Sequence, residues 1–127
     1  MTATQLREIL YTTLTAAYPT MTWQQAGMSK PATEPWGVLT YDGEAAPSVN
    51  DQYRAYIYYK VWIYKNGDEA VLVQRATDIK RLVNGVELTA SGKTAVFDWI
   101  STGRVFRDDL LMSDGIDITF RCLASSI

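Results

Sequence analysis

Apolar and polar side chains alternate most clearly between Tyr53 and Lys65, in the run YRAYIYYKVWIYK. Aromatic and β-branched residues suit the pleated, half-buried surface of a strand. Because side chains alternate across a strand, one face would carry Tyr53, Ala55, Ile57, Tyr59, Val61 and Ile63. The opposite face would carry Arg54, Tyr56, Tyr58, Lys60, Trp62 and Tyr64. The pattern therefore predicts a long strand with one core-like face and one face of aromatic rings with polar tips.

Two stretches have the spacing of apolar positions that is typical of an amphipathic helix. The first covers residues 2–18, with an apolar stripe of Leu6, Ile9, Leu10, Leu14 and Ala17. Thr2 and Gln5 have the spacing of a capping box at its start. The second begins after Asn66 or Asp68 as N-cap and ends at Asn84-Gly85. Its apolar stripe is Leu72, Ala76, Ile79, Leu82 and Val83.

Shorter runs of β-favouring residues predict further strands at Met21–Gln25, Trp36–Tyr41, Val86–Ser91, Thr94–Ile100 and Ile116–Ala124. In the run that begins at Val86, that residue, Leu88 and Ala90 would face inward. Turn-forming residues at Asp42–Asp51 predict a loop, which becomes a projecting hairpin tip if the strands beside it pair. The order of elements predicts an α+β fold, a mostly antiparallel sheet with two helices packed on one face. We expect residues 1–127 to form a single domain.

Composition narrows the classes of function. The 127 residues carry a net charge of −2, which provides no basic field for nucleic-acid binding. The absence of histidine removes imidazole metal ligands and the Ser-His and Cys-His dyads. The N-terminus has no signal-peptide pattern, and no window approaches the ~18 apolar residues of a membrane span. We therefore expect a soluble intracellular protein.

Two groups of residues could carry chemistry, and each has a simpler structural explanation. Cys122 is the single cysteine, but no histidine exists to activate it, so a small buried hydrophobe is preferred. Asp108 and Asp109 could bind a metal together with aspartates farther along the chain. Arg104 and Arg107 flank them, which favours a solvated loop with local ion pairs. We predict neither an enzyme nor a cofactor or metal site.

Three interpretations of the aromatic face remain open, and its residues are Tyr56, Tyr58, Lys60, Trp62 and Tyr64. The second helix could cover part of it within the chain. The rings could form a subunit interface, because aromatic residues are enriched in interface cores. They could also stack on the bases of a single-stranded nucleic acid, although the strand offers only two cations.

The order of elements and three segments resemble a known family, the tail terminator proteins of long-tailed (siphovirus-type) bacteriophages. The segments are TQLREILYTTLTAAYP, YRAYIYYKVWIYKNGDEA and GIDITFRCLASSI. The resemblance covers nearly the whole chain in length and element order. The family has no catalytic or ligand signature to match residue by residue.

The resemblance implies a structural virion protein of the tail or neck, assembled in the host cytoplasm. Such subunits form a hexameric ring that caps the tail tube, ends its polymerisation and joins the head-side connector protein. DNA would only pass through the lumen, and no membrane would be involved. The candidate subunit interface is the aromatic face defined above. The candidate contacts with the tail tube protein and the connector are Asp42, Glu44, Asp51, Arg104, Arg107, Asp108 and Asp109.

Two other functions are compatible with the same pattern. The chain could be another phage head-tail connector or neck protein, of the head-closure kind. It could instead be a small cytoplasmic binding domain that takes a peptide or small ligand in the cleft of its sheet. A ring of about six subunits would favour the tail terminator, and a strict monomer that binds a metabolite would favour the binding domain.

Overall fold

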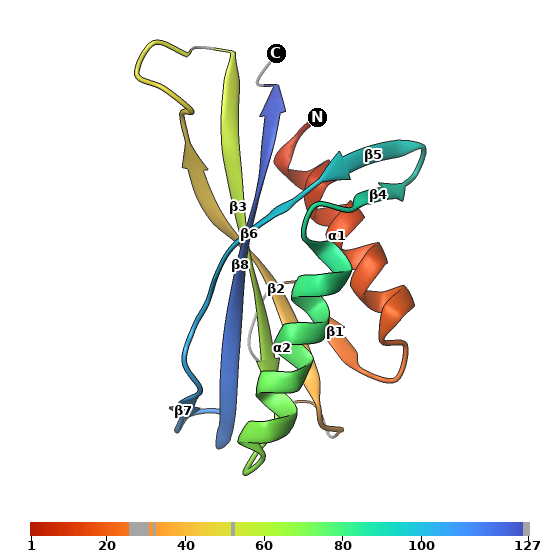
Figure 1. Cartoon of the computed structure of the whole chain (residues 1–127). Coiled ribbons are helices and arrows are strands. Elements are labelled where there is room, and N and C mark those ends of the chain that lie inside the picture. The colour runs from red at the N-terminus through yellow and green to blue at the C-terminus, as the bar shows by residue number, and fades with distance from the viewer. Residues whose placement is uncertain (26–30, 32, 52, 126–127) are drawn as a thin grey trace.

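The computed structural model describes residues 1–25, 31, 33–51 and 53–125, and Figure 1 shows the course of the chain. Its centre is a six-stranded sheet in the order β1-β2-β3-β8-β6, with β7 also paired to β8. The strands of this sheet are β1 (Thr22–Gln24), β2 (Trp36–Ala45), β3 (Arg54–Tyr64), β6 (Asp98–Thr102), β7 (Phe106–Asp108) and β8 (Ser113–Ser125). The other elements are α1 (Ala3–Ala17), α2 (Glu69–Val83) and a hairpin of β4 (Glu87–Ala90) and β5 (Lys93–Val96).

Both helices lie on one side of the sheet, where their apolar stripes form the core (Figure 1). The buried helical residues are Leu6, Ile9, Leu10 and Leu14 of α1, with Leu72, Ala76, Ile79 and Val83 of α2. All pairings within the sheet are antiparallel except that of β1 with β2. The predicted α+β fold is therefore confirmed. Neither helix of the described chain is long and apolar enough to cross a membrane.

Side-chain caps fix the starts of both helices. Thr2 Oγ1 accepts a hydrogen bond from the Gln5 N–H at 3.2 Å, and Gln5 Oε1 accepts one from the Thr2 N–H at 2.9 Å. Asp68 begins α2 by accepting a hydrogen bond from the Val71 N–H at 3.1 Å. Gly85 follows α2 with φ of 71°, a conformation that costs glycine little. The predicted capping box and helix exit are both present.

The long central pair of the sheet is β3 with β8. Their antiparallel register runs without a break from Arg54 opposite Ser125 to Tyr64 opposite Gly115. The predicted core face of β3 is buried from Ile57 to Ile63. It packs with the helices and with the core face of β8, made of Ile116, Ile118, Phe120, Cys122 and Ala124.

Several predicted strands have different bounds in the structure, and β8 begins at Ser113 rather than at Ile116. β2 continues past Tyr41 to Ala45, with a register shift between Tyr41 and Glu44 and a φ of 97° at Gly43. Because a bulge lets a strand continue around such a glycine, part of the predicted loop belongs to the sheet. β2 and β3 pair as an antiparallel hairpin, so the rest of the loop forms its projecting tip (Figure 1).

The strand predicted at Thr94–Ile100 divides at Phe97. Its first half, β5, pairs with β4, and its second half, β6, joins the main sheet beside β8. Phe97 lies fully buried at the junction and anchors the crossing in the core. Val86 precedes β4 and is 42% exposed, so the prediction that it faces inward is wrong.

Candidate interaction surface

The predicted aromatic face of β3 is the sheet face that the helices do not cover. The core-face residues of β3 share their cluster with the stripes of α1 and α2. The interpretation that the second helix covers the aromatic face is therefore wrong, because α2 packs on the opposite face of the sheet (Figure 1). Tyr56, Tyr58, Lys60 and Trp62 are half-buried, whereas Tyr64 is 1% exposed.

At the C-terminal end of β3, the chain itself covers the aromatic face. Trp36 and Tyr64 stack with ring centroids 4.4 Å apart and an interplanar angle of 17°. Phe106 of β7 packs edge-on against Trp62 at 5.9 Å and against Tyr64 at 6.0 Å. Leu111 completes this second cluster. Tyr64 is thus enclosed and offers no surface to another subunit.

Toward the N-terminal end of β3, the face is open and carries a cation on aromatic rings. The Arg121 guanidinium of β8 lies 4.0 Å from the centroid of the Tyr56 ring. It also donates a hydrogen bond to the Tyr58 hydroxyl, which raises the pKa of Arg121. Its Nε is enclosed, with no hydrogen-bond partner in the described chain. The two tyrosines therefore hold one guanidinium in a fixed position on an accessible surface.

Lys60 differs from Arg121 because it forms an ion pair with a carboxylate. Its Nζ lies 5.5 Å from the centroid of the Trp62 ring and 3.8 Å from the Asp117 carboxylate. One of the cations on this face is thus balanced within the chain. Contacts with nucleic-acid phosphates depend on unpaired cations, so the arrangement gives little support to the base-stacking interpretation.

The two predicted contact segments lie at opposite ends of the molecule (Figure 1). Asp42 and Glu44 are exposed on the extension of β2, beside the hairpin tip. Asp51 closes the tip by accepting hydrogen bonds from the N–H groups of Tyr53 at 3.0 Å and Arg54 at 2.9 Å. These bonds, together with an ion pair to Arg54 at 2.7 Å, lower the pKa of Asp51.

At the other end of the molecule, Arg107 gathers the polar side chains. Its guanidinium lies 3.7 Å from the Asp109 carboxylate and 3.6 Å from that of Asp114, and it donates to Asn66 Oδ1 at 2.6 Å. Arg104 is exposed nearby in the chain. The local ion pairs expected from the sequence are present in this segment.

The side chains considered for chemistry have structural roles. Asp108 Oδ1 accepts a hydrogen bond from the Leu111 N–H at 3.0 Å and so holds the turn after β7. Cys122 is 5% exposed, and burial raises the pKa of its thiol, which confirms the interpretation as a buried hydrophobe. Within the described ranges, no three or more His, Cys, Asp or Glu side chains are grouped so that they could hold a metal ion.

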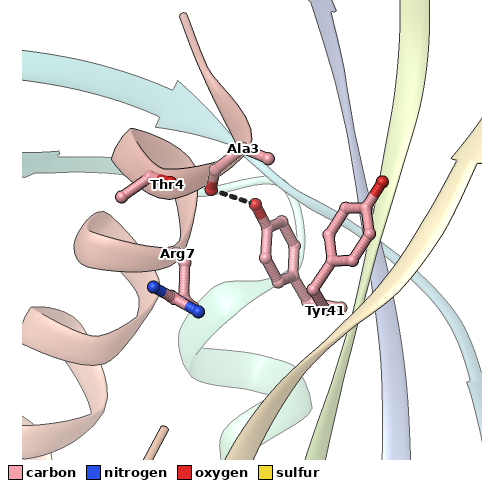
Figure 2. Close-up of a pocket in the computed structure, with 5 residues that line it drawn as sticks. Ala3, Thr4, Arg7 and Tyr41 are labelled. Carbon is pink, nitrogen blue, oxygen red and sulfur yellow. Dashed lines mark hydrogen bonds between the residues drawn. The ribbon is translucent and has the colours of Figure 1, made fainter. Parts of the chain in front are cut away.

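A pocket that the sequence did not reveal lies between the start of α1 and the sheet (Figure 2). It has a volume of about 250 Å³ and is lined by Ala3, Thr4, Arg7, Tyr41 and Tyr59. The Tyr59 hydroxyl donates a hydrogen bond to the Ala3 carbonyl, and burial raises the pKa of Tyr59. Tyr41 is 48% exposed and meets the edge of the Tyr59 ring at 6.1 Å. Only the packing of α1 on β2 and β3 creates this site, and no local pattern encodes that packing.

Comparison with known proteins places the fold. No protein-family model and no curated protein matches the chain. A chain from the virion of a native gene transfer agent particle superimposes with a TM-score of 0.66 and 16% identity, over 95% of each chain. This chain shares its fold with a virion component. A second solved structure matches with a TM-score of 0.65 and 15% identity, over 100% of this chain and 97% of the other.

Proposed function

We propose that this chain is a structural protein of a phage-like virion, and that its role there is that of a tail terminator. The observation that carries the proposal is the shared fold with a chain of a gene transfer agent virion, over 95% of both chains. The resemblance of the sequence to tail terminators supports the finer assignment. In this role the protein acts through its shape and its contacts.

A terminator needs three contact surfaces, for its neighbours in the ring, for the tube and for the connector. The uncovered sheet face with Tyr56, Tyr58 and Lys60 is the candidate for contact between subunits. The hairpin tip and the segment around Arg107 lie at opposite ends of the long strands (Figure 1). A ring stacked between two partners needs contact residues at both ends, so we assign the tube to one end and the connector to the other.

Tail length tests the proposal directly. In the particle whose genome encodes this chain, removal of its gene should give abnormally long tails, because tube polymerisation would no longer be stopped. Supplying the gene in trans should restore the normal length. Tails of normal length that lack heads would instead identify a connector or head-closure protein. Unchanged, infectious particles would contradict any role in the virion.

A further inference from the structure

Two strands of the sheet have unpaired edges at the hairpin-tip end of the molecule (Figure 1). Within the described residues, β1 pairs with β2 only at Trp36–Val38, so no described strand pairs with the outer edge of residues 39–45. β6 pairs with β8 only up to Arg121, which leaves residues 122–125 free on that side. In the described chain, no other backbone hydrogen bond reaches these stretches outside their ladders with β3. Free edges are templates for pairing with another chain.

The two free edges belong to different strands, and these strands run in the same direction. β2 and β8 are each antiparallel to β3, so they are parallel to one another. A second copy rotated about an axis along the strands would bring its β2 beside β8 as a parallel neighbour. This contact between β2 of one copy and β8 of the next is called the joint below. Because it uses two different surfaces, it is head-to-tail, and its repetition closes into a ring when the rotation between copies allows.

The side chains beside the two edges have complementary charges. Tyr41 pairs with Tyr59 on the helix side of the sheet, and the bulge sets Asp42 and Gly43 together opposite Tyr58. Because Tyr58 lies on the open face, the sheet face that the helices do not cover, Asp42 is placed on that face too. Asp42 is exposed and has no ion pair in the described chain. Arg121 also lies on the open face, immediately before the free stretch of β8, with its guanidinium over the Tyr56 ring. Asp98 of β6 is its cross-strand neighbour and acts on it electrostatically, but the two form no ion pair in the described chain.

Apolar surface also accompanies both edges. Tyr41 is 48% exposed beside β2, while Leu123 and Val96 are each 42% exposed beside β8. A pocket of about 420 Å³, lined in part by Val96 and Leu123, opens next to the free stretch of β8. A strand that is added there would cover these side chains and part of the pocket.

The acidic side chains of β2 exclude the symmetric alternative. Pairing of β2 with β2 of another copy would bring Asp42 and Glu44 of both copies together, and like charges that face each other are destabilising. The free stretch of β8, residues 122–125, contains no charged residue, and Arg121 precedes it. The β2 edge therefore favours β8 of a second copy over its own equivalent.

We propose that the free edge of β2 in one copy extends the sheet of the next copy at β8, with Asp42 paired to Arg121 of that neighbour. The inference rests on the proposed ring and names the joint that closes it. Tyr56 and Tyr58 then position Arg121 for Asp42 of the neighbouring copy, in addition to any contact that their own rings make with that copy.

Cysteine pairing tests the joint. In a Cys122→Ala background, Asp42→Cys and Leu123→Cys place thiols on the open face beside the two edges. The double variant, treated with a short bis-thiol cross-linker, should give a ladder of cross-linked multimers. Either single variant alone should stay uncross-linked, and a mixture of the two should give dimers. Cross-linking within one single variant, or none in the double variant, would overturn the joint.

Charge reversal tests it without cysteines. Asp42→Arg should weaken self-association by roughly tenfold or more, because it places like charges across the joint. Addition of Arg121→Asp to the same chain should restore much of the loss. Glu87→Arg, at an exposed position on β4, is the matched control and should leave association unchanged. Equal effects of Asp42→Arg and Glu87→Arg would contradict the proposed pairing.

Different experimental results would contradict the joint and the proposed function. A ring that persists by mass measurement but shows neither the cross-linking pattern nor the charge effect overturns the joint and leaves the terminator assignment in place. A protein that remains monomeric at high concentration also overturns the joint. Tails of normal length after gene removal overturn the terminator assignment, whichever edges pair.

Discussion

At the residue scale, the open face is built from contacts in which a ring supports a cation. Arg121 lies over Tyr56, and Lys60 lies over Trp62. Each such contact is worth about 0.5–1 kcal/mol at an exposed site and more when water is removed. A partner that covers this face and excludes water would therefore strengthen contacts that already exist.

Burial on α2 gives a stability prediction with a matched control. Leu72 is fully buried, whereas its neighbour Val73 is 46% exposed. Leu72→Ala should lower the free energy of unfolding by about 2–5 kcal/mol, because it removes buried methyl groups and leaves a cavity. Val73→Ala should change it by less than about 0.5 kcal/mol. Urea unfolding of the two variants provides the measurement, and equal losses would show that α2 is not seated on the sheet as described.

The raised pKa of Tyr64 predicts how the free energy of unfolding depends on pH. Burial raises the pKa of Tyr64 from 10.0 to about 12, so the folded state holds the phenolic proton more tightly than the unfolded state. Its contribution to stability is therefore complete below pH 10 and is lost as the pH rises toward 12. Tyr64→Phe should make the alkaline fall in the free energy of unfolding less steep in urea titrations. Tyr53→Phe, at a side chain that is 62% exposed, should keep the wild-type slope.

At the element scale, the helices and the central strands follow from local sequence. The cap of α2 is a single side-chain bond from the Val71 N–H to Asp68. Asp68→Ala should cost about 1 kcal/mol of stability, because an N–H of the first turn loses its acceptor. Asp68→Ser should recover most of this loss, since serine can accept the same bond. Chemical denaturation of both variants is the measurement, and failure of serine to rescue would contradict the capping role.

The elements that could be predicted from the sequence are those whose pattern is local. The stripe of α2 and the alternation of β3 depend on the nearest few residues, and both are present. The continuation of β2 was missed because Asp42 and Gly43 are turn-forming residues, and only pairing with β3 keeps them in a strand. The division of the strand at Phe97 depends on which partners its two halves find, and these lie far apart in sequence.

For the candidate site, the alternation of side chains along β3 correctly predicts that the aromatic residues share one face. It does not predict which parts of the chain cover that face. β7 has only three residues, too few to show a period, so the sequence did not place Phe106 over the aromatic face. Glu44, Asp51 and Arg107 were recognisable as polar loop positions. Their placement at opposite ends of the molecule required the register of the sheet.

At the scale of the whole molecule, a substitution on the open face tests whether self-association can be weakened without loss of folding stability. Tyr58→Asp should weaken self-association more than thermal stability, because the new carboxylate would pair with Arg121 within the chain and occupy it. Val73→Asp on the outer side of α2 is the control and should leave association unchanged. Size measurements over a concentration series, with thermal unfolding in parallel, separate the two effects. A stability loss that matches the loss of association would show that Tyr58 serves the internal packing.

The uninterrupted pairing of β3 with β8 also fixes a length within the molecule. β3 has 11 residues, which span roughly 36 Å at ~3.3 Å per residue. Of the candidate contacts for tube and connector, Asp51 precedes the start of β3 and Arg107 lies past the level of its end, so the strand would act as a rigid spacer between these two. The height at which the connector stands above the last tube ring would then be a property of strand length, unaffected by changes in the helices.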